Sequence, residues 1–126
     1  MAGIFSLNGS YQVTPGAGYP SGAATISVPL NEALVLRNET YQQFDLTSNT
    51  AYDVPFNGLA AAHVIALKVI GGKVVMRVTT TDGSQQAIPV DTFGIFFLGS
   101  APATAIDLTR PTGVPVTVQL FLGERA

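Results

Sequence analysis

Apolar and polar residues alternate in short runs along most of the chain, a pattern typical of β-strands. No stretch keeps an apolar period near 3.6 residues, and the best candidate for a short helix is residues 59–62. Gly, Pro, Asn and Asp separate the runs, as turns require. Eight or more short strands predict one all-β domain over residues 1–126, an antiparallel β-sandwich or jelly roll. Besides the segments described below, strands are expected at residues 4–7, 11–14, 24–28, 33–37, 41–47 and 87–90.

Residues 63–80 predict a β-hairpin around Gly71-Gly72. A two-residue turn of this kind needs positive φ at both central positions, which glycine tolerates. The resulting register pairs Leu67 with Met76 and separates two faces. The face expected in the core holds Ile65, Leu67, Val69, Val74, Met76 and Val78, whereas the outward face holds Val64, Ala66, Lys68, Ile70, Lys73, Val75, Arg77 and Thr79.

Residues 105–122 predict a second hairpin, in which two alternating strands flank a three-residue loop at residues 111–113. This loop length pairs Leu108 with Val116, so that the apolar sides of both strands face the core. It also places Pro at the first corner of the turn and Gly113 where positive φ is expected.

Three further segments depart from simple alternation. Residues 14–22 contain Pro and Gly too often for a regular element and predict a loop or an extended arm. Asp82-Gly83 predicts a turn with a bulge or a longer loop. Residues 93–98 are apolar on both sides, which predicts either a central strand covered on both faces or a strand whose second face meets a partner.

The charge content changes this picture. Charged residues make up 11% of the 126 residues, compared with about 25% in an ordinary soluble domain. Too few charges are present to cover the surface in the usual way, so part of it is expected to be polar and uncharged and part to be buried against partners. A net charge of −2 argues against a nucleic-acid partner, and no apolar run is long enough to span a membrane. No secretory signal is evident at the start of the chain.

Catalytic and ligand-binding chemistry is not evident. The chain has no cysteine and one histidine, His63, which is expected near the rim of the core. The acidic residues are scattered, mostly at strand ends and turns, and form no local metal-binding loop. Residues 16–18 and 71–73 resemble nucleotide-binding glycine motifs only superficially. The first lacks the required strand–turn–helix context, and the second has Val74 where a phosphate loop needs Ser or Thr and no Gly at position 67. We therefore expect no enzyme activity, no metal and no organic cofactor.

A mixed apolar and basic patch is the strongest candidate site. In the predicted hairpin of residues 63–80, basic residues alternate with apolar ones on the outward face. The alternative is an ordinary solvated face on which basic residues discourage aggregation. Together with two aromatic residues further along, the candidate interface comprises Val64, Lys68, Ile70, Lys73, Val75, Arg77, Phe96 and Phe121.

The sequence of residues 64–123 resembles small virion proteins of tailed bacteriophages, most clearly in the strand-like runs at residues 74–83, 95–98, 105–109 and 116–123. The resemblance implies a head decoration (cement) protein or a head–tail accessory protein, assembled in the host cytoplasm into the virion. Its partners would be copies of itself, with a trimer the first expectation, and a major capsid protein or another virion protein. The alternative is a carbohydrate-binding β-sandwich, which would stack sugars on exposed tyrosines, or a receptor-binding accessory domain.

Overall fold

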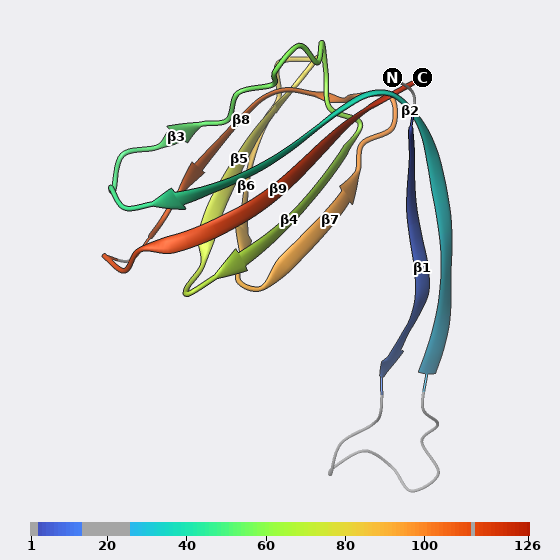
Figure 1. Cartoon of the computed structure of the whole chain (residues 1–126), viewed down its shortest axis with the longest axis horizontal. Helices are drawn as coiled ribbons and strands as arrows, with labels where there is room; N and C mark the ends of the chain where they lie inside the picture. Colours follow the sequence, from blue (N-terminus) through green and yellow to red (C-terminus); the bar gives the residue numbers. More distant parts are fainter. Residues whose placement is uncertain (1–2, 14–25, 112) are drawn as a thin grey trace, which may run out of the picture.

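The chain folds into an all-β structure (Figure 1). The computed structural model describes residues 3–13, 26–111 and 113–126. These residues contain strands and no helix, so the predicted all-β class is confirmed and the short helix at residues 59–62 is not formed. The strands are β1 (Gly3–Val13), β2 (Ile26–Leu46), β3 (Tyr52–Asp53), β4 (Val64–Ile70), β5 (Val74–Thr80), β6 (Gln85–Val90), β7 (Phe93–Phe97), β8 (Ala103–Thr109) and β9 (Val116–Arg125).

Two antiparallel sheets form the two layers of a sandwich. One sheet has the strand order β1-β2-β9-β4-β7 and the other has the order β3-β8-β5-β6. The alternate apolar side chains of both sheets meet in one continuous core. The sandwich prediction is therefore confirmed, whereas the strand order does not establish the jelly-roll alternative. Side chains with no exposed surface in this core are Ala62, Ile65, Val74, Met76, Ala103, Leu108, Val118, Leu120 and Leu122.

The predicted hairpin of residues 63–80 is wrong, because β4 and β5 lie in different sheets. β4 pairs with β9 and β7, and β5 pairs with β6 and β8. Only Gly71 of the glycine pair has positive φ, at 92°. A Cβ on Gly72 would lie 2.6 Å from Cγ1 of Val116, so glycine is needed here for close approach as the chain crosses between layers. Leu67 and Met76 are both buried, as expected, but from opposite sheets.

The predicted C-terminal hairpin is wrong for the same reason. β8 pairs with β5 and β3, whereas β9 pairs with β2 and β4. Leu108 and Val116 are buried as predicted, although they are not paired with each other. Arg110 fixes the crossing, since its Nε and Nη2 donate to the carbonyl oxygens of Ser48 (2.9 Å) and Thr47 (2.7 Å).

The loop predicted around Asp82-Gly83 is present, whereas the strand at residues 93–98 is not central. β5 and β6 form a hairpin in which Thr79 pairs with Gln85, which confirms the longer loop expected around Asp82-Gly83. β7 is not a central strand, because it occupies the edge of the five-stranded sheet. One side of this strand therefore lacks a neighbouring strand among the described residues.

β1 and the first half of β2 form a two-stranded ribbon that projects from the sandwich (Figure 1). Their pairing runs without interruption from Gly3↔Leu36 to Val13↔Ile26. The separate strands expected at residues 24–28, 33–37 and 41–47 thus belong to one 21-residue strand. The strands expected at residues 4–7 and 11–14 likewise join in β1, which continues through residues 8–10. The loop or arm expected at residues 14–22 lies outside the described residues.

The ribbon is joined to the sandwich where β2 changes register at Arg37. The side chain of Leu36 is completely buried at this joint, and Arg37 forms an ion pair of 3.0 Å with Glu124. The backbone N–H of Ala126 also donates to the carbonyl oxygen of Val35 at 3.0 Å. Residues 124–126 therefore stabilise the base of the ribbon.

We expect Gly123→Ala to destabilise the fold by about 1–3 kcal/mol, because the added methyl group would overpack the joint. A Cβ at this position would lie 2.7 Å from Cγ1 of Val64 and 2.9 Å from Cδ2 of Leu36. The matched control is Gly99→Ala, where no atom beyond the two neighbouring residues lies within 4 Å of the position that the added methyl group would take. Urea unfolding of both variants tests this, and equal midpoints would contradict the tight joint.

Candidate functional site

The outer faces of the two sheets differ in chemistry. On the four-stranded sheet, the outward side chains are mostly small or polar, and Arg77 forms an ion pair with Asp107 (2.6 Å). This face has the composition of an ordinary solvated surface. Its other outward residues on β5, β6 and β8 are Val75, Thr79, Gln85, Ala87, Pro89, Ala105 and Thr109.

The outer face of the five-stranded sheet carries an apolar row across four strands. Tyr41 on β2 lies opposite Phe121 on β9, which lies opposite Ala66 on β4, which lies opposite Ile95 on β7. A hollow of about 260 Å³ follows this row and is also bordered by Phe93. Tyr41, Phe93 and Phe97 are 64%, 68% and 44% exposed, respectively. We call this surface, comprising Tyr41, Ala66, Phe93, Ile95, Phe97 and Phe121, the aromatic face.

The residues predicted to form one interface do not lie together. Lys68, Ile70 and Phe121 are on the outer face of the five-stranded sheet, as are the aromatic residues just described. Val75 and Arg77 are on the opposite side of the sandwich. The single patch is therefore wrong, because the hairpin that would have united its members does not form. Of the other members, Val64 is buried, Lys73 lies in the turn before β5, and Phe96 points into the sandwich.

Tyr41 and Phe93 were not among the eight predicted interface residues, although the sequence contains a signal for both. Side chains alternate between the two faces of a strand, and Leu46 of β2 and Phe96 of β7 point toward the core. Tyr41 and Phe93 are an odd number of residues from these and therefore point outward. Two large aromatic side chains at outward positions of strands are the pattern of a contact surface.

Phe5 of the ribbon packs on the aromatic face. The ring of Phe5 stacks on that of Phe121, with centroids 5.4 Å apart, and meets the ring of Phe97 edge-on at 5.7 Å. Aromatic pairs at these distances stabilise a contact by about 0.5–1.5 kcal/mol beyond their buried area. Phe5 thus helps to hold the base of the ribbon against the sandwich.

The two sides of the ribbon also differ. Residues opposite each other in an antiparallel pair share a face, so Phe5, Leu7, Leu30 and Leu34 lie on the same side, together with Gly9 and the exposed Glu32. We call this side the ribbon's apolar face. Phe5 joins it to the aromatic face of the sandwich. The opposite side is exposed and carries Ile4, Ser6, Asn8, Asn31, Ala33 and Val35.

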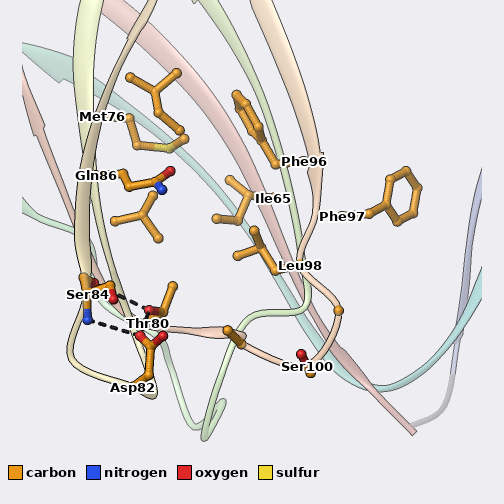
Figure 2. Close-up of a pocket in the computed structure, with 14 residues that line it drawn as sticks. Ile65, Met76, Thr80, Asp82, Ser84, Gln86, Phe96, Phe97, Leu98 and Ser100 are labelled. Atoms are coloured by element: carbon orange, nitrogen blue, oxygen red, sulfur yellow. Dashed lines mark hydrogen bonds between the residues drawn. The ribbon is translucent and has the colours of Figure 1, made fainter.

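A cleft of about 490 Å³ opens between the two sheets at the side formed by β6 and β7. Figure 2 shows Ile65, Met76, Phe96 and Leu98 directed into this cleft, whereas Phe97 points away from it. The lining is apolar inside, and Ser84, Gln86 and Ser100 add polar atoms near its mouth. Such a lining suits an apolar group of a ligand or of another protein better than it suits an ion.

Asp82 lies at the mouth of the cleft in the loop between β5 and β6 (Figure 2). Its carboxylate accepts hydrogen bonds from the Thr80 hydroxyl and from the backbone N–H of Ser84, the latter at 3.0 Å. These bonds lower the pKa of Asp82, the Thr80 bond most. The bonds also close the loop, which explains the residue without a catalytic role.

His63 lies at the rim of the core, as predicted. Its Nδ1 accepts a hydrogen bond of 3.1 Å from the backbone N–H of Arg125, so it helps to hold the end of β9. Among the described residues, no group of three or more histidine, cysteine or acidic side chains could hold a metal ion. Over the same residues there is no helix long and apolar enough to cross a membrane. The expected absence of catalytic and cofactor chemistry stays a prediction.

No protein-family model, curated protein or solved structure matches this chain. Its function must therefore be inferred from its own surfaces.

We expect stability to fall as the pH drops below about 6.5, the usual pKa of histidine. Burial, followed by the charge of Arg125, lowers the pKa of His63 in the fold; the Arg37 charge acts in the same direction and Glu124 opposes it. The unfolded chain therefore binds a proton more readily than the folded chain, and acid favours unfolding. In His63→Asn a side-chain oxygen can still accept from Arg125 but does not titrate. Urea unfolding at pH 7.5 and pH 5.5 should show a smaller loss of stability for this variant, and equal losses would contradict the assignment.

Proposed function

We propose that the protein is a structural subunit of a tailed-bacteriophage particle, a capsid decoration or head–tail accessory protein that self-associates and packs on a larger shell. The observation that carries the proposal is the pairing of an exposed aromatic face with a projecting ribbon. Both lie on the five-stranded sheet, whereas the outer face of the other sheet has an ordinary solvated composition. The resemblance of residues 64–123 to small virion proteins supports the same class.

The energetics of the ribbon favour a partner. An isolated two-stranded ribbon is only marginally stable in water, and three strands or a packed face are normally needed. Here the ribbon spans eleven residues of β1, and its aromatic contacts with the sandwich, made by Phe5, are at its base. Contact with another subunit or with a shell would cover the remaining apolar face.

The aromatic face favours a partner for a separate reason. Burying a large apolar side chain stabilises a contact by about 1.5–3 kcal/mol. Tyr41 and Phe93 leave most of that gain unused in the isolated chain, because each is more than half exposed. In a symmetric shell the same contact is repeated at every copy, so modest contacts sum to a stable assembly. Self-association into a trimer, the expectation from sequence, remains part of the proposal.

The proposal predicts that particles of the phage that encodes this chain contain it in many copies. Quantitative mass spectrometry of purified particles should give a copy number that is a fixed multiple relative to the major capsid protein. Absence of the chain from intact particles would overturn the virion assignment, whatever its association in solution.

Particles of the same phage that are prepared without the chain allow the role of the aromatic face to be tested by rebinding. Phe93→Ser should weaken rebinding of the added chain by about tenfold or more, because an exposed aromatic anchor is lost. Val75→Ser is the matched control on the outer face of the other sheet. Equal losses for both variants would show that the aromatic face is not the contact.

A second candidate is carbohydrate binding, favoured by the shape of the hollow. Tyr41 and Phe93 border it, with the Gln119 amide between their strands, so rings and a polar group are both available to a sugar. If sugar binding is the function, titration calorimetry against bacterial surface polysaccharide should show binding that Tyr41→Ala weakens about tenfold or more. No heat of binding, or an unaltered affinity in the variant, would remove this candidate.

A further inference from the structure

The backbone of β7 alternates between bonded and unbonded residues. The N–H of Leu98 donates to the carbonyl of His63 at 2.7 Å, and the N–H of Val69 donates to the carbonyl of Thr92 at 2.9 Å. These bonds fix the phase of the β4–β7 ladder, in which hydrogen-bonded pairs recur at every second residue. The backbone groups of Phe93, Ile95 and Phe97 therefore face away from β4, toward the open edge of the sheet.

This edge lacks three features that usually prevent strands from pairing, because β7 reads FGIFF and contains no proline, no charged residue and no bulge. The outer strand of the other sheet on the same side, β6, is interrupted by Pro89. In the part of the chain that the structure describes, no backbone hydrogen bond engages the outward groups of β7.

We propose that β7 pairs with β7 of a second copy, antiparallel about a two-fold axis at Ile95. This register sets Ile95 opposite itself and Phe93 opposite Phe97 of the second copy. Each of the three pairs is of the hydrogen-bonded type, which exchanges two bonds, so about six backbone bonds form. The two five-stranded sheets then become one continuous sheet.

The side chains of β7 fit this pairing. Phe93 and Phe97 are both exposed and both lie on the aromatic face, so each copy supplies one ring to each cross-strand pair. Phe97 already contacts Phe5, and the Phe93 ring of the second copy would extend that cluster. A two-fold contact needs a surface that complements itself, and a short strand with a phenylalanine at each end satisfies this condition.

The position of the ribbon independently supports a second copy of the chain at the β7 edge. Figure 1 shows the ribbon leaving the sandwich on the β7 side, and its base rests on Phe97 of that strand. The continuous sheet would carry the aromatic face of the second copy beneath the ribbon's apolar face. Glu32 on that side of the ribbon and Lys68 on the sheet of the second copy have opposite charges, which favours the approach of the two copies. Edge pairing alone gives a dimer, and combined with a three-fold contact it gives a hexamer.

The test of the β7 contact uses the fact that Ile95 of one copy would lie opposite Ile95 of the other. Ile95→Lys and Ile95→Glu should each weaken dimerisation by about tenfold or more, because like charges would meet on the axis. An equimolar mixture should regain dimers, since Lys and Glu then face each other. Sedimentation velocity measures all three samples, with Val75→Lys as the control on the other sheet and circular dichroism to verify folding.

A crosslink provides a second measurement that does not require a disruptive charge. The chain contains no cysteine, so Ile95→Cys introduces a single thiol that should oxidise to a disulfide-linked dimer across the axis. Cα atoms about 5.5 Å apart, as in a hydrogen-bonded antiparallel pair, are within reach of a disulfide. Val75→Cys should remain uncrosslinked under the same mild oxidation.

This inference rests on the proposed self-association, and the outcomes separate the two. If the wild-type chain associates but the charged variants associate equally well, the β7 contact is overturned and another surface is used. If the chain is monomeric in solution yet present in particles, the β7 contact and the proposed self-association both fail, whereas the virion function stands. If the charge pair restores dimers but particles lack the chain, the contact stands and the virion function fails.

Discussion

The inward side of β9 holds the structure together. Val116, Val118, Leu120 and Leu122 are buried in succession between the layers, and the backbone of the same strand bonds β2 on one side and β4 on the other. Each of these side chains contributes about 1.5–3 kcal/mol when it leaves water. The base of the ribbon also depends on this strand, because Gly123 admits Leu36 and Glu124 pairs with Arg37.

Covering one face of each sheet leaves two outer faces with different compositions. The four-stranded sheet turns Thr, Ala, Gln and an ion pair toward solvent, which explains how a chain with 11% charged residues keeps one side hydrated. The five-stranded sheet instead presents aromatic rings, an uncapped edge and the ribbon. The features that favour association are thus concentrated on one side, and this separation is the physical basis of the proposed role as an assembling subunit.

The candidate site was predicted only in part. Lys68 and Phe121 were expected to face outward, and they do, because the parity of a strand follows from which residues are apolar enough for the core. Arg77 also faces outward, but on the other side of the molecule. The alternation of apolar and polar residues shows which side chains of a strand face the core, but it carries no information about which sheet the strand joins. Phe5 could not be predicted as the anchor of the ribbon, since its contacts with Phe97 and Phe121 span most of the chain.

The sequence by itself determined the all-β class, most strand positions and, apart from Val64, the buried side of β4, β5, β8 and β9, because two-residue periodicity and burial are local properties. Leu67, Met76, Leu108 and Val116 are accordingly in the core as predicted. Tertiary structure alone decided which strands pair. Gly71-Gly72 is as compatible with a tight hairpin as with a crossing between layers, and the crossing prevails because each flanking strand gains two ladder neighbours and a place in the shared core. The same non-local pairing placed β7 at an edge and joined residues 3–13 and 26–36 into a ribbon, and no short segment contains that information.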